Sequence, residues 1–97
     1  MATDGMVLLS YWQQVHQQLL GQPYMTEFGK DNVIMKSIVG VYGIEKTKRM
    51  IDFFFGRLMT DPFLQQTGAT VGVFKTQIAK LVLDLSTEVV DKNIGKL

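Results

Sequence analysis

Apolar residues recur at intervals of three and four along most of the chain, which is the spacing of a helix with one buried face. The first such set comprises Leu8, Trp12, Val15 and Leu19, and the polar residues between them are mostly glutamines. Gly21 and Pro23 come next, and a glycine closely followed by a proline commonly ends a helix. The pattern predicts a first amphipathic helix that stops near Gly21.

Two more helices are predicted on either side of Gly43. In the segment before it, residues 30–43, Asp31 or Asn32 is a suitable N-cap, because either side chain accepts a hydrogen bond from a free backbone N–H. The apolar arc of this helix comprises Ile34, Met35, Ile38, Val39 and Tyr42. The next helix runs from about Ile44 to Met59, and its core set comprises Ile44, Thr47, Ile51, Phe54, Phe55 and Leu58. Because almost nothing separates these helices, we expect them to pack at an angle as neighbours.

The last third of the chain predicts a short helical piece and a final helix. A turn at residues 60–62 places a proline in a first helical turn, and Phe63 and Leu64 are expected to fold back onto the core. Thr67 or Thr70 can cap the final helix. Its stripe comprises Val71, Phe74, Ile78, Leu81, Val82, Leu85 and Val89. No segment shows the alternation of a half-buried strand, so the chain is predicted to be all-α, a compact bundle of four to five short helices.

Length and composition indicate one small domain. The 97 residues are 46% hydrophobic and 20% charged, with a formal net charge of +1, so we predict a single helical domain over residues 1–97 with frayed ends at residues 1–5 and 92–97. The chain has no cysteine, which excludes disulfides and thiolate chemistry. The N-terminal segment lacks the basic start of a signal peptide, and no apolar run approaches the roughly 20 residues that span a bilayer. We therefore expect a cytoplasmic protein that does not contact a membrane.

The segment GATVGVFKT, residues 68–76, contains the glycines, lysine and threonine of a phosphate-binding loop. In such a loop the lysine directly follows the second glycine, so that it reaches the phosphates, and a buried strand comes before the loop. Here Lys75 stands three positions after Gly72, and the preceding segment does not resemble a strand. We interpret the segment as the start of the last helix.

Nothing in the spacing of the ionisable residues indicates an enzyme. His16 is the only histidine, and its neighbours in sequence are glutamines and apolar residues, which cannot tune an imidazole for acid–base chemistry. The acidic residues are dispersed, without a Glu-x-x-His pair or a calcium-loop spacing. We therefore predict no catalytic residues, no metal site and no cofactor.

The third helix carries the one pattern that suggests a binding surface. At about 100° per residue, one face comprises Lys46, Arg49, Phe53 and Arg57, with Lys36, Lys75 and Lys80 as an extension if the helices pack suitably. Cations neutralise phosphates, and an exposed ring can stack on a base or fill a pocket of a partner. The same face can also be no more than a solvated surface, and both interpretations stay open.

Two further features favour binding over catalysis. The chain has six methionines, whose flexible side chains suit adaptable apolar surfaces, although they also fill cores. The glutamine-rich side of the first helix carries little charge that would keep another protein away. Self-association or a partner helix at the first helix is a further prediction.

The pattern FGKDNVIMKSIVGVYGIEKTKRMIDFFF…DPFLQQTGATVGVFKTQIAKL resembles small helical modules of bacteriophage replication proteins of the replisome-organiser and helicase-loader type. The resemblance covers Glu27 to Leu81 and rests mainly on core and cap positions. It implies a role in phage DNA replication or host takeover, exerted by binding in the cytoplasm of the host cell, and it brings no catalytic residues. Such proteins usually carry a separate winged-helix domain, for which this sequence has no room.

These observations lead to two functional predictions. The first is a non-enzymatic binding module that contacts DNA through the basic and aromatic face of the third helix. The alternative is a protein-only adaptor or inhibitor that docks on a host or phage factor through an exposed apolar surface.

Overall fold

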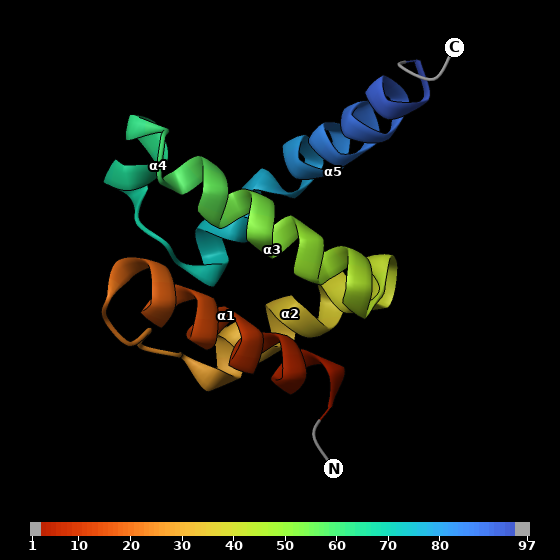
Figure 1. Ribbon diagram of the computed structural model, residues 1–97. Helices are drawn as coiled ribbons and strands as arrows, with labels where there is room; N and C mark the ends of the chain where they lie inside the picture. The colour runs from red at the N-terminus through yellow and green to blue at the C-terminus, as the bar shows by residue number, and fades with distance from the viewer. Residues whose placement is uncertain (1–2, 95–97) are drawn as a thin grey trace.

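The computed structural model of the protein describes residues 3–94, and the side chains of these residues other than Phe28, Asp84 and residues 86–94. Within that range the chain forms only α-helices and their connections (Figure 1). The helices are α1 (Asp4–Leu20), α2 (Phe28–Tyr42), α3 (Ile44–Leu58), α4 (Pro62–Thr67) and α5 (Val71–Ile94). The predicted all-α bundle of four to five helices is confirmed.

Glycine and threonine set most of the helix ends that the sequence predicts. Gly21 ends α1 with a φ of 72°, and Gly43 separates α2 from α3 with a φ of 83°, both in the left-handed region that favours glycine. Thr70 caps α5, because its hydroxyl accepts the backbone N–H of Val73 at 3.1 Å. The segment 68–76 is therefore a helix start, as predicted.

One prediction about helix ends is corrected. Helix α2 begins at Phe28, one turn before the expected caps, so Asp31 lies inside the first turn and its carboxylate accepts the N–H of Glu27 from within the helix. At the two ends of the chain, α1 begins at Asp4 and α5 extends to Ile94. Of the segments expected to be frayed, residues 1–2 and 95–97 lie outside the described residues. The side chain of Val89, predicted on the apolar stripe of the last helix, also lies outside them.

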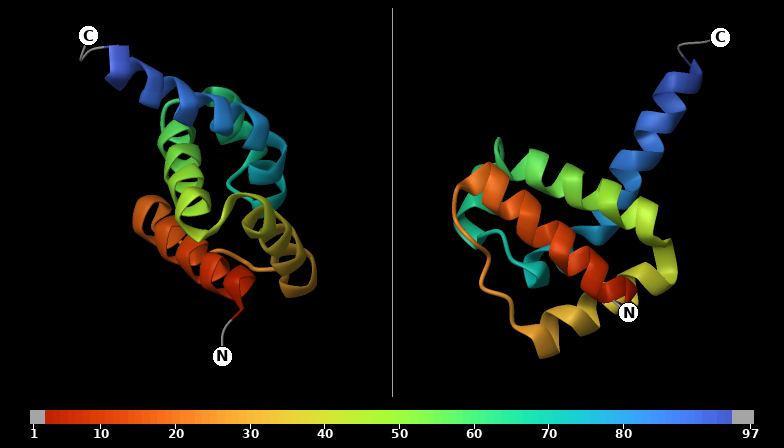
Figure 2. Two further views of the ribbon diagram at one scale, coloured as in Figure 1. Left: turned by 90° about the vertical axis from the view of Figure 1, so that its right-hand side faces the viewer. Right: turned by 60° about the horizontal axis from the view of Figure 1, so that its bottom comes forward.

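Helix α3 is the centre of the bundle, with contacts to each of the other four helices. The core between the helices is aromatic. The ring of Trp12 in α1 lies 5.5 Å from Phe54, 4.8 Å from Phe55 and 5.3 Å from Phe74, measured between centroids. All four rings are fully buried, so this cluster joins α1, α3 and α5. The C-terminal part of α5 projects beyond the rest of the bundle (Figure 2).

The apolar stripes identify most of the core, with three differences. Leu19 is exposed, as is the whole last turn of α1, residues 17–20. Phe63 is exposed while Leu64 is buried, since adjacent residues on a single short helix point about 100° apart. Met50 is fully buried between Thr47 and Phe54, where its spacing of three and four residues places it on the same stripe.

Helices α1 and α2 cross closely at Gly5, which is buried. A Cβ atom added to Gly5 would lie 2.7 Å from the Oδ1 atom of Asn32 and 3.2 Å from its backbone oxygen. Both distances are shorter than an ordinary van der Waals contact, and a backbone oxygen within a helix cannot easily move aside. The approach of α1 to α2 therefore requires glycine at this position.

We predict that Gly5→Ala lowers the melting temperature by at least about 4 °C, because overpacking of this kind typically costs about 1–3 kcal/mol. The matched control is Gly40→Ala in α2, where an added Cβ would have no neighbour within 4 Å. That variant should melt higher than the parent, since alanine is the better helix former. Thermal unfolding followed by circular dichroism measures both melting temperatures. A higher melting temperature in both variants would contradict the close crossing of α1 and α2.

Candidate functional site

The predicted binding face of α3 lies on an unbroken helix. Lys46, Arg49, Phe53 and Arg57 fall within an arc of about 80° at 100° per residue, and the helix is continuous from Ile44 to Leu58. Lys46 and Arg49 are exposed, while Thr47, Ile51 and Phe54 on the other side are buried. The sequence therefore predicted correctly which side of the N-terminal half of α3 faces the solvent.

The C-terminal half of the same face differs from the prediction. Phe53 is half-buried and packs against the hydrophobic core, so it is not an outward ring between cations. Arg57 is half-buried as well, and it already takes part in an interaction within the protein. Asp52 lines the same shallow depression as Phe53 and Arg57, which brings a carboxylate next to the basic face. The exposed cations of this face are thus Lys46 and Arg49.

The three additional lysines do not form one extension of this face. Lys36 lines a hollow between α2 and the N-terminal end of α1, together with Thr3 and Asp4. Lys75 and Lys80 are both exposed on α5, but five residues of α-helix separate them by about 140°. They therefore point to different sides of α5 and cannot both adjoin α3.

Two lysines of α3 lie close to tyrosine rings. The Nζ atom of Lys46 lies 5.4 Å from the centre of the Tyr42 ring, a distance at which a ring face attracts a cation. Lys48, on the edge of α3 next to α1, lies 5.5 Å from the Tyr11 ring. Tyr11 donates a hydrogen bond to Asp52, and this bond, with burial, raises the pKa of Tyr11 to about 12. Arg49 has no ion-pair partner among the described residues.

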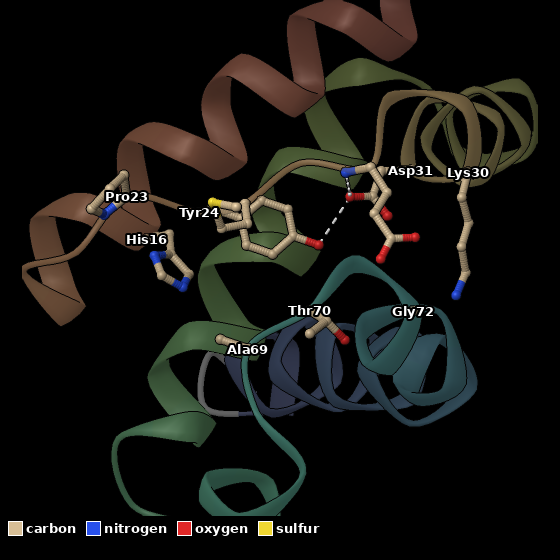
Figure 3. A pocket seen from close by; sticks show the side chains of 10 residues that line it. His16, Pro23, Tyr24, Lys30, Asp31, Ala69, Thr70 and Gly72 are labelled. Carbon is tan, nitrogen blue, oxygen red and sulfur yellow. Dashed lines mark hydrogen bonds between the residues drawn. The ribbon is translucent and has the colours of Figure 1, made fainter.

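A polar network that sequence reasoning missed joins three parts of the chain (Figure 3). The hydroxyl of Tyr24 accepts the backbone N–H of Val71 at 3.1 Å and donates to the carboxylate of Asp31 at 3.0 Å. The same Asp31 oxygen accepts the N–H of Glu27 at 3.1 Å. Asp31 is buried because it stands four residues before Met35, on the apolar stripe of α2. A carboxylate on an apolar stripe is the signal that could have revealed the network.

The network lies beside a pocket of about 400 Å³, whose lining includes His16, Lys30 and Thr70. The Nδ1 atom of His16 lies 2.7 Å from the backbone oxygen of Gln22, and the ring packs against Tyr24 and Phe55. In the part of the chain that the structure describes, no hydrogen bond joins His16 to a carboxylate, and no group of three potential metal ligands occurs. The hydrogen bonds of the network hold the α1–α2 loop against α5.

A second hollow, of about 370 Å³, lies at the end of the bundle where α1, α3 and α4 finish. It is lined by Leu20, Leu58, Met59, Gln65, Gly68 and Ala69. Leu20 and Met59 on its rims are exposed to 38% and 51%, and Phe63 on α4 is exposed to 63%. We call the surface formed by these six lining residues the uncharged end. The sequence signal for it is a lack of charge: no Asp, Glu, Lys or Arg occurs between Asp4 and Glu27 or between Asp61 and Lys75.

Comparisons with known proteins returned no relatives: no protein-family model, no curated protein and no solved structure matches the chain. Among the described residues, no helix is long and apolar enough to cross a membrane.

The Tyr24 network makes a specific prediction about stability. Tyr24→Phe removes the acceptor of the Val71 N–H and one donor to the buried Asp31, so it should lower the free energy of unfolding by about 1–3 kcal/mol. The matched control is Tyr11→Phe, because the Tyr11 hydroxyl bonds to Asp52 at an exposed site, and its loss should cost less than about 0.5 kcal/mol. Urea unfolding measures both values, and equal values would contradict a structural role for the network.

The two tyrosines also predict how stability changes in alkali. Burial, together with the bond to Asp31, raises the pKa of Tyr24 to about 12, although the hydrogen bond from Val71 lowers it. An unfolded tyrosine has a pKa of about 10, so the contribution of both phenols to stability is complete below about pH 10 and is lost as the pH rises through about 12. The double variant Tyr11→Phe, Tyr24→Phe should therefore lose less stability than the parent over this range. Urea midpoints measured at stepped pH test this, and parallel curves would contradict it.

Proposed function

We propose that the protein is a helical binding module that contacts DNA phosphates through the N-terminal half of α3. The observation that supports this most directly is the pair of exposed cations, Lys46 and Arg49, which lie about 60° apart on one rigid helix. A guanidinium group with no ion-pair partner is free to bind a phosphate, and a helix holds it in a fixed direction at little cost in entropy.

The contact is local rather than a broad basic surface. The formal net charge of the chain is +1, and Glu45 and Asp52 stand on the same helix, so long-range attraction of DNA is weak. Two phosphate contacts give an affinity that depends on salt only moderately. Participation in phage DNA replication or host takeover belongs to the same proposal and rests on the sequence resemblance alone.

A second candidate function, docking on another protein, is favoured by the uncharged end. Apolar side chains exposed together on a small protein mark a surface that another molecule covers. This function requires neither Lys46 nor Arg49, so substitutions on α3 separate the two functions.

We predict that the logarithm of the association constant for a short DNA duplex falls with the logarithm of the salt concentration. The slope should be near −1.8, about −0.9 for each of two phosphate contacts. Arg49→Ala should bring the slope to about −0.9 and weaken binding at low salt, with unchanged thermal stability because Arg49 is exposed. Fluorescence anisotropy of a labelled duplex, titrated at several salt concentrations, gives each slope.

The matched control for this titration is Lys30→Ala, which removes an exposed positive charge from α2. Lys30 lines the pocket beside the Tyr24 network, not the face of α3. It should leave both the slope and the affinity unchanged. No binding at low salt, or the same slope for Arg49→Ala as for the parent, would rule out contact with DNA through α3. Binding of an identified replication protein that survives Arg49→Ala would favour the second candidate.

A further inference from the structure

Asp31 carries a buried negative charge that no basic side chain near it neutralises. The residue is 4% exposed, and a carboxylate so far from water is normally paired with a cation. The groups that bond to it are the hydroxyl of Tyr24 and the backbone N–H of Glu27, and both are neutral donors. Neither Lys30 nor His16, the two basic residues that line the same pocket, forms an ion pair with Asp31.

The charged form of Asp31 is stabilised from one side only. Both hydrogen bonds end on the same carboxylate oxygen, Oδ2, and the first turn of α2 adds its partial positive charge. The other oxygen, Oδ1, has no hydrogen bond to the residues drawn in Figure 3, and it is not one of the fully enclosed polar atoms that lack a partner. Asp31 lines the pocket of about 400 Å³, so a ligand in that pocket can reach Oδ1.

The rest of the pocket wall indicates which kind of cation fits. The lining holds two carboxylates, of Asp31 and Glu27, against the single lysine Lys30. Lys30 is exposed and stands one residue before Asp31, about 100° away around α2. The rings of His16 and Tyr24 lie 5.4 Å apart between their centroids on the other side of the pocket. An ammonium group offers three N–H donors to carboxylate oxygens, and an apolar body attached to it can lie against these rings.

A bare metal ion fits this pocket less well than an organic cation. Calcium takes six to eight oxygen ligands, whereas the described residues contain no group of three potential metal ligands. The volume of about 400 Å³ also lies in the range of small-molecule sites, roughly 300–1,000 Å³. Both the size and the lining therefore favour a small organic molecule.

We propose that this pocket binds a small molecule that carries a primary ammonium group and an apolar body. The ammonium group lies on the carboxylates of Asp31 and Glu27 and supplies the missing positive charge, while the body lies against the rings of His16 and Tyr24. The inference does not depend on DNA binding, because the pocket is lined by α1, α2, the start of α5 and the loops before α2 and α5, without any residue of α3.

Two backbone amides report binding at this site, since the N–H of Glu27 bonds to Asp31 and the N–H of Val71 bonds to Tyr24. Benzylamine, added to the isotope-labelled full chain, should shift the NMR signals of both amides and saturate at about millimolar concentration, as expected for so small a ligand. Benzyl alcohol has the same shape without the charge. It should bind at least about tenfold more weakly, because hydrogen bonds between charged groups are the stronger ones.

Variants of the charged residues distinguish an electrostatic site from a merely structural one. Glu27→Gln should weaken benzylamine binding by about threefold or more, and Lys30→Gln should strengthen it by a similar factor, because they remove an attracting and a repelling charge. Both side chains are exposed, so circular dichroism should show an unchanged fold. Asp31→Asn should abolish the preference for the amine over the alcohol.

The matched control is Glu45→Gln, which removes an exposed carboxylate from α3 and should leave the affinity for benzylamine unchanged. Three results would overturn the proposal. These are equal affinities for the amine and the alcohol, an affinity for the amine that neither Glu27→Gln nor Lys30→Gln changes, and displacement of the amine by an equal concentration of calcium chloride.

Discussion

The burial of Trp12 is the interaction on which the rest of the structure depends. Its indole contacts the rings of α3 and α5 and the edge of Tyr24 in the α1–α2 loop, so one side chain joins three helices and a connection. Each such ring pair contributes about 0.5–1.5 kcal/mol beyond the burial of its area. The indole N–H has no hydrogen-bond partner among the described residues, a cost of about 1–3 kcal/mol that the surrounding rings offset.

The aromatic cluster also determines which surfaces remain for binding. Phe54 and Phe55 point inward from α3 to meet Trp12, which fixes the rotation of α3 about its axis and turns Arg49 toward the solvent. The indole meets these rings in the C-terminal half of α3, and the last turn of α1 remains uncovered. The exposed face of α3 that carries Lys46 and Arg49 and the uncharged end thus follow from a single packing arrangement.

Charge is distributed unevenly along this scaffold. The segments between Asp4 and Glu27 and between Asp61 and Lys75 carry no Asp, Glu, Lys or Arg, and the fold brings parts of both to one end of the bundle. Charged residues such as Lys46, Lys48, Arg49 and Asp52 lie instead along α3. A molecule built in this way has an end suited to apolar and amide contacts and a helix edge suited to phosphate.

The sequence by itself determined the helices and most of the core, because spacing by three and four, glycine stops and a threonine cap are local signals. It also determined that Lys46 and Arg49 share one face of α3. Only the tertiary structure decided that Phe53 packs inward, that Arg57 is already engaged and that Leu19 is exposed, since each depends on which neighbouring helix covers the residue. The Tyr24–Asp31 network and the uncharged end depend on the fold for the same reason: they join residues far apart in the sequence, and helical periodicity carries no information about contacts between helices.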